Sequence, residues 1–264
     1  MNVFLFELKA YRKTNIIWTL SIIAGMLFFM ALFPTFAKDA EEMNRMLQAY
    51  PESVRKALGL TADLATLLGY YSYVLLFVTL SGSIQAMNLG LSIISKEARH
   101  KTADFLLTKP VKRSFVLASK IAAAASSMAL TSICYMAAAY FTALFVKVAP
   151  FDTRIFFLLS LTLFFMQIIF LSLGFIVAVV FTRIKSVLSI SLGTVFGFFI
   201  INMLGSILGE NTLRYITPFK YFDFLFIIKN GSYELNFVIL GALVTAAAFS
   251  LSFIIYSRKD INTV

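Results

Sequence analysis

The chain has 264 residues, of which 60% are hydrophobic and 14% are charged, and its mean hydropathy is +0.87. A soluble domain carries about 25% charged residues, so this composition excludes an ordinary soluble protein and indicates an integral membrane protein. The single cysteine, Cys134, excludes an internal disulfide and argues against a thiolate metal cluster. The formal net charge of +10 would suit a nucleic-acid-binding protein, so the distribution of the charge decides what it means.

The first residues, 2–13, predict an amphipathic helix that lies in the cytoplasmic membrane interface and leads into the first span. The apolar side chains at helical spacing are Phe4, Leu5, Leu8 and Tyr11. The charged side chains, which lie largely elsewhere on the helical wheel, are Glu7, Lys9, Arg12 and Lys13. A frayed basic tail is the alternative interpretation of this segment.

Six apolar stretches are long enough to cross the hydrocarbon core, which takes about 20 residues of helix. They are residues 16–36, 71–94, 116–146, 155–181, 187–208 and 235–256. We therefore expect an all-α polytopic membrane protein with a single transmembrane domain over residues 1–264. The third and fourth stretches exceed a minimal span, so tilting or projection beyond the bilayer is expected for them.

An even number of spans places both termini on one side of the membrane. The termini, residues 96–120 and residues 183–185 carry 14 Lys or Arg against 4 acids, whereas the other three connections carry 9 against 9. Because cytoplasmic loops are enriched in Lys and Arg, we expect both termini to be cytoplasmic. The compact chain suits a bacterial plasma membrane. Topology accounts for the whole net charge, so no nucleic-acid partner is expected.

Two of the outer connections have patterns of their own. Residues 37–69 predict either two short amphipathic helices separated by Pro51 or a solvated connector. Residues 216–231 predict a re-entrant or interfacial outer helix of about 11 residues, too short to span, with Pro218 in its first turn and a stop at Asn230-Gly231. The segment is too aromatic to lie free in water, and Phe219 is one of its aromatic side chains. Asp223 is expected to face the bundle or the aqueous mouth, or merely to lie on the wet face of the helix.

Small and polar side chains within the spans predict helix contacts. Small residues recur at intervals of four along the fifth span, where they would serve a subunit interface or an intrachain contact. They are Ser189, Gly193, Gly197, Gly205 and Gly209. The polar residues Gln85, Asn88 and Asn202 are candidates for a transport path, and the alternative is that they hydrogen-bond between helices.

Catalytic chemistry finds little support in the sequence. The cores of the six spans contain no Asp, Glu, Lys, Arg or His, which argues against a carboxylate protease or a proton-coupled carrier. With one histidine, His100, the chain excludes a zinc protease of the HExxH type, and we expect no metal site. No GxxxxGK motif occurs, so we expect that the chain is not an enzyme and that it has no catalytic residues and no P-loop ATP site.

The segment KEARHKTADFLLTKPVKRSFVLASK, residues 96–120, interrupts the apolar sequence with seven Lys or Arg and an FLL patch. This segment, the basic amphipathic N-terminus, the TPF at 217–219, the closing YSRKDI at 256–261 and the six-span layout resemble the ABC-2 type permease family. That family comprises membrane subunits of ATP-driven transporters. Within it, the chain looks most like the NosY-like and bacitracin-export-like branch. A generic positive-inside loop would explain the cations of residues 96–120 but not the FLL patch.

The resemblance implies a coupling helix at about residues 97–108, which docks into a groove of a separate cassette ATPase. The implied docking residues are Glu97, Arg99, Phe105 and Leu106, with Arg183 and Lys185 as a second contact. ATP and Mg would bind to the partner, and none of this chain's residues would hold a cofactor. Two ATPase subunits and a second permease subunit, identical or homologous, would complete an alternating-access transporter, with residues 216–231 shaping the outer gate.

Three functions therefore compete. The first is a permease that exports an amphipathic or apolar cargo, which fits spans without buried charges. The second is a membrane-bound sensor or scaffold that recruits a cytoplasmic partner without transport. The third is an intramembrane enzyme of unrecognised type.

Overall fold

The computed structural model describes residues 3–39, 45–46, 49–51, 54–55, 62–100, 113–181, 184–208 and 212–258, but not the side chains of residues 97–100 and 258. The described residues form helices and no strand. The helices are α1 (Val3–Ala31), α2 (Phe33–Lys38), α5 (Leu67–His100), α7 (Arg113–Val146), α8 (Thr153–Val180), α9 (Val187–Leu208), α10 (Leu213–Ile216), the 3-10 helix η1 (Pro218–Lys220), α11 (Phe224–Asn230) and α12 (Leu235–Arg258).

Six segments of 22 to 36 residues are long and apolar enough to cross a membrane, which confirms the expected all-α, six-span fold. They comprise α1 with α2, then α5, α7, α8, α9 and α12. Each predicted span lies in one of these segments, apart from Phe181 at the end of the fourth. The first span breaks at Leu32, between α1 and α2. Pro34, in the first turn of α2, accounts for the break because it has no N–H to donate to the preceding turn.

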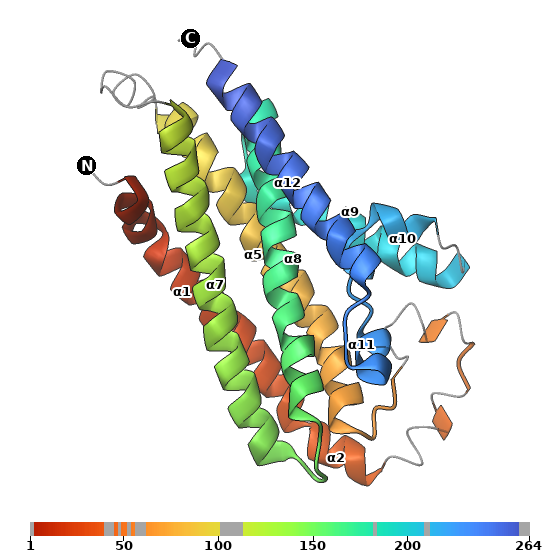
Figure 1. Cartoon of the computed structure of the whole chain (residues 1–264). Helices are drawn as coiled ribbons and strands as arrows, with labels where there is room; N and C mark the ends of the chain where they lie inside the picture. Colours follow the sequence, from red (N-terminus) through yellow and green to blue (C-terminus); the bar gives the residue numbers. More distant parts are fainter. Residues whose placement is uncertain are drawn as a thin grey trace.

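The helices α5 and α8 form the centre of the bundle. In Figure 1, α1 and α7 lie on one side of this pair, and α9 and α12 lie on the other. In the apolar stretches of α5 and α8, 72% and 61% of the residues are buried, against 17% to 28% in the other four spans. The outer helices therefore turn most of their surface away from the protein.

Glycines allow the central pair to pack backbone against backbone. A Cβ atom added at Gly90 of α5 would lie 2.6 Å from the carbonyl oxygen of Leu171, and one at Gly174 of α8 would lie 2.7 Å from the carbonyl oxygen of Met87. No side chain fits at either position without moving a backbone. Small residues permit such an approach between membrane helices.

Both chain ends lie at one end of the bundle. Figure 1 shows the N- and C-termini at the same end as the last turn of α5 and the first turn of α7, whereas α2 and the turn between α7 and α8 lie at the opposite end. Asp152 caps α8 at that opposite end, because its side chain accepts hydrogen bonds from the backbone N–H groups of Arg154 and Ile155.

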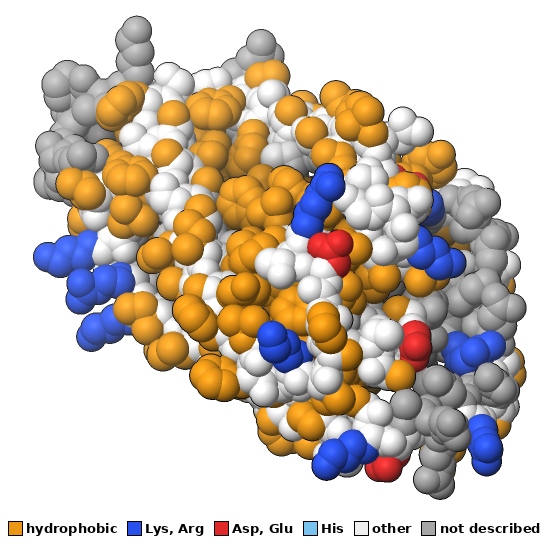
Figure 2. Space-filling view, turned by 60° about the horizontal axis from the view of Figure 1, so that its bottom comes forward, with side chains coloured by type: hydrophobic (Ala, Val, Ile, Leu, Met, Phe, Trp, Pro, Cys, Tyr) orange, Lys and Arg blue, Asp and Glu red, His pale blue; other side chains and the backbone are white. Residues whose placement is uncertain are grey.

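The outward surface is rich in hydrocarbon. Many large apolar side chains of the outer helices are exposed, among them Ile17, Phe28, Ile133, Phe141 and Leu243. Figure 2 shows hydrophobic side chains over much of the visible face, with a group of Lys and Arg side chains at its left edge. Soluble proteins rarely expose so much contiguous apolar surface, whereas a lipid-facing surface has this character.

Candidate functional site

The predicted docking segment begins within a helix. Helix α5 continues beyond its predicted end at Ile94 to His100, and α7 begins at Arg113. The backbone at Glu97 and Arg99 is therefore helical, but their side chains lie outside the described residues, as do Phe105, Leu106 and Arg183 altogether. Lys185 is described and is exposed, next to the buried Ile184. The structure thus leaves the docking contacts as a prediction.

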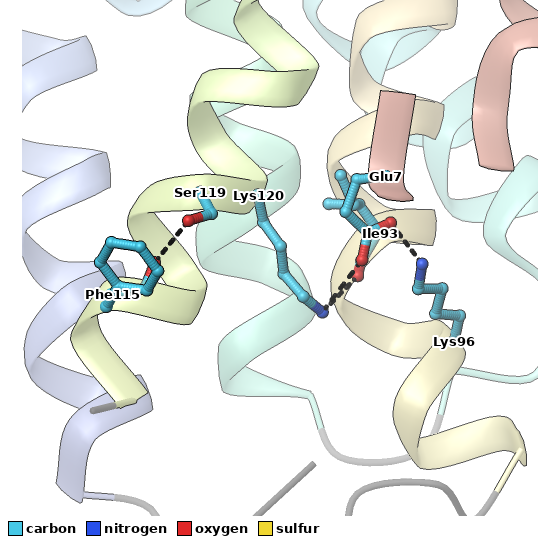
Figure 3. A network of polar contacts seen from close by, with 6 residues as sticks. All are labelled: Glu7, Ile93, Lys96, Phe115, Ser119 and Lys120. Carbon is cyan, nitrogen blue, oxygen red and sulfur yellow. Dashed lines mark hydrogen bonds and ion pairs between the residues drawn. The ribbon is translucent and has the colours of Figure 1, made fainter. Parts of the chain in front are cut away.

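A cluster of charged side chains is buried at the end of the bundle that carries the termini (Figure 3). The carboxylate of Glu7 on α1 lies between Lys96 on α5 and Lys120 on α7. Lys96 Nζ donates a hydrogen bond to Glu7 Oε2, and Lys120 Nζ lies 4.0 Å from Glu7 Oε1. Lys120 Nζ also donates to the carbonyl oxygen of Ile93 at 2.9 Å. Three helices are thereby joined through one carboxylate.

The placement of Glu7 adds a feature that the predicted N-terminal helix did not include. Leu5 is 57% exposed, as an apolar side chain that faces lipid would be, whereas the residue Glu7 is only 3% exposed. The two lysines supply the countercharge that a buried carboxylate requires. The N-terminal segment is also continuous with the first span as α1, although Figure 1 shows its first turns at an angle to the rest of the helix. The one sequence signal for this cluster was Lys120, which falls within the third predicted apolar stretch.

A chain of neutral hydrogen bonds crosses the middle of the bundle through four helices. Gln167 on α8 donates to Gln85 Oε1 on α5 at 3.1 Å, and Gln85 donates to Thr131 Oγ1 on α7 at 3.2 Å. Ser132 donates to Gln167 Oε1 at 2.8 Å, and the hydroxyls of Thr131 and Thr19 lie 2.9 Å apart. Gln85 is 1% exposed. This geometry favours the alternative that Gln85 joins helices, because its polar atoms are already bonded to protein.

A second polar layer lies nearer the opposite end of the bundle. The hydroxyl of Tyr71 on α5 lies 3.0 Å from that of Tyr135 on α7 and 2.7 Å from Ser160 Oγ on α8. All three residues are buried. The layer joins three of the four helices in the glutamine network, α5, α7 and α8, and so fixes their register at a second level.

The other two candidates for a transport path do not join Gln85. Asn88 is half-buried, and its Oδ1 accepts a long hydrogen bond of 3.5 Å from Ser92 on the same helix. Asn202 lies on α9, is 8% exposed, and its buried Oδ1 lacks a hydrogen-bond partner in the described structure. The described contacts therefore bring no two of these three residues into one site.

The predicted row of small residues on α9 faces open space over much of its length. A Cβ atom at Gly193 or Gly197 would have no atom within 4 Å, and Ser189 is exposed. Only Gly205 meets a neighbour, because an added Cβ would lie 3.1 Å from Leu213 Cβ. Gly209 lies outside the described residues. At Gly193 and Gly197 the row thus makes no close intrachain contact, and the close approach occurs instead between α5 and α8.

The predicted outer helix at residues 216–231 is broken into two pieces. Pro218–Lys220 is the 3-10 helix η1, and α11 begins only at Phe224, where the side chain of Asp223 accepts a hydrogen bond from Phe226 N at 3.1 Å. Asp223 is therefore an N-cap, which explains its position better than a bundle-facing or merely wet-face role. Gly231 ends α11 in the left-handed conformation, at φ +60°.

Aromatic contacts hold this outer segment against the bundle. Phe219 of η1 packs on Phe170 of α8 and Phe199 of α9. The hydroxyl of Tyr233, between α11 and α12, donates to the carbonyl oxygen of Leu158 on α8, and burial raises the pKa of Tyr233 to about 12. The segment is thus packed on the helices rather than free in solvent.

An ion pair joins α10, in the outer segment, to the residue that precedes α12. Arg214 of α10 pairs with Glu234, and its guanidinium lies 3.8 Å from the centre of the Phe237 ring at the start of α12. Arg214 Nε also donates to the carbonyl oxygen of Lys220 at 3.2 Å. One arginine side chain, that of Arg214, therefore holds α10, η1 and α12 together.

Comparison with known proteins identifies the family. The family model described as "ABC-2 family transporter protein" matches residues 1–261 of the chain. No curated protein matches the chain. Among the described residues, no group of His, Cys, Asp and Glu side chains could hold a metal ion.

Proposed function

Since the chain belongs to the ABC-2 family of transporter proteins, we propose that it exports an amphipathic or apolar cargo, with energy supplied by a separate ATPase subunit through residues 96–120. Membership of the family makes it a membrane permease of an ABC transporter, which associates with an ATPase subunit and with the membrane. The direction, the cargo class and the docking segment are our proposal. So are a location in a bacterial plasma membrane with cytoplasmic termini, and the NosY-like and bacitracin-export-like branch.

The observation that carries this proposal is the unbroken course of α5. It runs from Leu67 at one end of the bundle to His100 at the end that holds the termini. Along the way it packs backbone to backbone against α8 at Gly90 and Gly174. A force applied to the last turn of α5 would therefore act on the centre of the bundle, as coupling to an ATPase requires.

The scarcity of charged side chains in the spans supports an apolar or amphipathic cargo. The six predicted spans contain one residue that is charged or a histidine, Lys120, and it lies near the edge of the third. The polar side chains of the glutamine network are neutral and bonded to one another. A cargo with a deeply buried charge would need a charged or strongly polar partner at depth, and the spans offer little of this kind.

We further propose that two permease subunits and two ATPase subunits assemble, with α9 in the contact between the permeases. The open positions at Gly193 and Gly197 support this arrangement, because a partner helix could approach the α9 backbone there as closely as α5 approaches α8. The outer segment from α10 to α11 would then border the exit of the path.

Co-purification tests the proposal. The tagged protein is isolated in mild detergent from its native membrane, beside a variant with Glu97→Arg and Phe105→Asp, and the retained proteins are identified by mass spectrometry. The matched control is Asp39→Arg with Met46→Asp, which makes the same kinds of change at exposed residues of the opposite end.

We expect a cassette ATPase to accompany the parent and the control variant but not the docking variant. Equal retention by all three proteins would refute the docking role of residues 97–108. If a well-folded parent protein retains no ATPase, the proposal that an ATPase subunit supplies the energy is contradicted. The sensor or scaffold function would then replace the proposed export function.

A further inference from the structure

The buried charge cluster lies one helical turn before the end of α5, where the proposed docking segment starts. Lys96 is four residues before His100, and its partner Glu7 belongs to α1. Of the three charged side chains, Lys120 is fully buried, Glu7 is 2% exposed and Lys96 is 20% exposed. Charged groups are seldom sequestered in this way unless the paired geometry has a use.

Lys96 is attached to α1 by three separate contacts. Its ammonium group donates to Glu7 and lies 5.1 Å from the ring centre of Phe6 and 5.2 Å from that of Tyr11. A cation within about 6 Å of an aromatic ring is attracted by the ring. Two successive turns of α1 thus surround the end of one lysine side chain from α5.

The third helix is attached at the same place. Lys120 of α7 donates to the carbonyl oxygen of Ile93, which lies one turn before Lys96 on α5, and faces Glu7 from the other side (Figure 3). A sideways movement of the last two turns of α5 would therefore change contacts to both α1 and α7. From Glu7, α1 continues as one helix to Thr19, which joins the glutamine network.

Stability alone does not account for this cluster. A buried ion pair is often no more stabilising than well-packed apolar residues of the same volume, whereas its directional contacts fix the relative positions of the groups. We infer that Glu7 is a positioning residue for energy coupling, and that it makes α1 follow the cytoplasmic end of α5 when the ATPase displaces it. This inference rests on the proposed function.

A distance measurement on the assembled complex tests it. In a Cys134→Ser background, spin labels are placed at Lys13 on α1 and Val180 at the end of α8, both of which are exposed. The distance distribution is recorded without nucleotide and with the ATPase trapped by ADP and vanadate. We expect trapping to shift the distribution in the parent complex. We expect Glu7→Gln to abolish the shift while ATPase is still retained at the assay temperature, although removal of the carboxylate between two lysines lowers the thermal stability.

Two further variants separate positioning from a general loss of structure. Glu7→Asp keeps a carboxylate between the two lysines and is expected to keep the shift. Glu234→Gln removes the carboxylate that pairs with Arg214 of α10 and is expected to leave the shift unchanged. If Glu7→Gln alone fails to assemble, Glu7→Asp is expected to show both assembly and the shift.

The contrary results are distinct. An unchanged shift in Glu7→Gln, an immobile label in the parent complex, or loss of the shift in Glu7→Asp would overturn the inference and leave the proposed function standing. A parent protein that retains no ATPase would refute the proposed function, and the inference would fall with it.

Discussion

Gly174→Ala is expected to force apart the two central helices, α5 and α8. The added Cβ atom would lie 2.7 Å from the carbonyl oxygen of Met87 and 3.2 Å from Gly90 Cα, both of them backbone atoms that cannot rotate away. Ordinary van der Waals contact begins at 3.4 Å, so the helices must separate locally by the difference, about 0.7 Å. The buried side chains on either side would then lose contacts.

The cost follows from two opposing effects. Overpacking of a close-packed interior costs about 1–3 kcal/mol, and replacing a helical glycine with alanine recovers up to about 1 kcal/mol of helix propensity. Because the clash is with backbone atoms, its cost lies in the upper part of that range, about 2–3 kcal/mol, and the net loss of unfolding free energy is about 1–2 kcal/mol. At about 2–4 °C per kcal/mol for a chain of this size, the melting temperature should fall by about 2–8 °C.

The matched control is Gly25→Ala on α1, where an added Cβ atom meets no atom within 4 Å. The assay is thermal unfolding of the two variants and the parent in the same detergent, without the ATPase. We expect Gly25→Ala to melt at or slightly above the parent temperature. Equal melting temperatures for Gly174→Ala and the parent, or a larger fall for Gly25→Ala, would refute the close approach of α5 and α8.

Three other changes have expected results. Gln167→Leu removes two interhelical hydrogen bonds and should lower the unfolding free energy by about 0.5–2 kcal/mol, measured by thermal unfolding; an unchanged value would contradict the network. Asp152→Ala should cost about 1 kcal/mol in the same assay through the lost cap of α8, whereas Asp152→Asn should cost little. In a Cys134→Ser background, a membrane-impermeant thiol reagent should label Asp39→Cys but not Lys185→Cys in intact cells, and the reverse pattern would invert the topology.

The number and places of the spans could be predicted because each depends on a local property. A run of about 20 apolar residues has few structures available to it other than a membrane-crossing helix, whatever its neighbours do. The ends were less accessible, since α5 continues through charged residues to His100 and a hydropathy pattern stops at the first of them. Asp223 shows the same limit: the aromatic run from Ile216 predicted one helix, and the N-cap at Asp223 divides it.

Contacts between helices were harder to predict because they depend on partners distant in the chain. The regular row on α9 drew attention to Gly193 and Gly197, which make no close intrachain contact. The close contact is instead between Gly174 and Gly90, and Gly90 belongs to a shorter row of small residues with Gly82 and Ala86. Burial of Glu7 likewise requires lysines from two other helices, and spacing within residues 2–13 alone cannot show them.

The most direct test of the central claim is site-specific photo-cross-linking from Phe105. A photoreactive amino acid is placed at position 105 and, as the control, at the exposed Tyr50 on the opposite side, and cells are irradiated before the adducts are identified by mass spectrometry. If the ATPase drives the permease through residues 96–120, position 105 will yield an adduct with a cassette ATPase and position 50 will not. An adduct with some other cytoplasmic protein in place of an ATPase, or ATPase adducts of equal yield from both positions, would contradict the account.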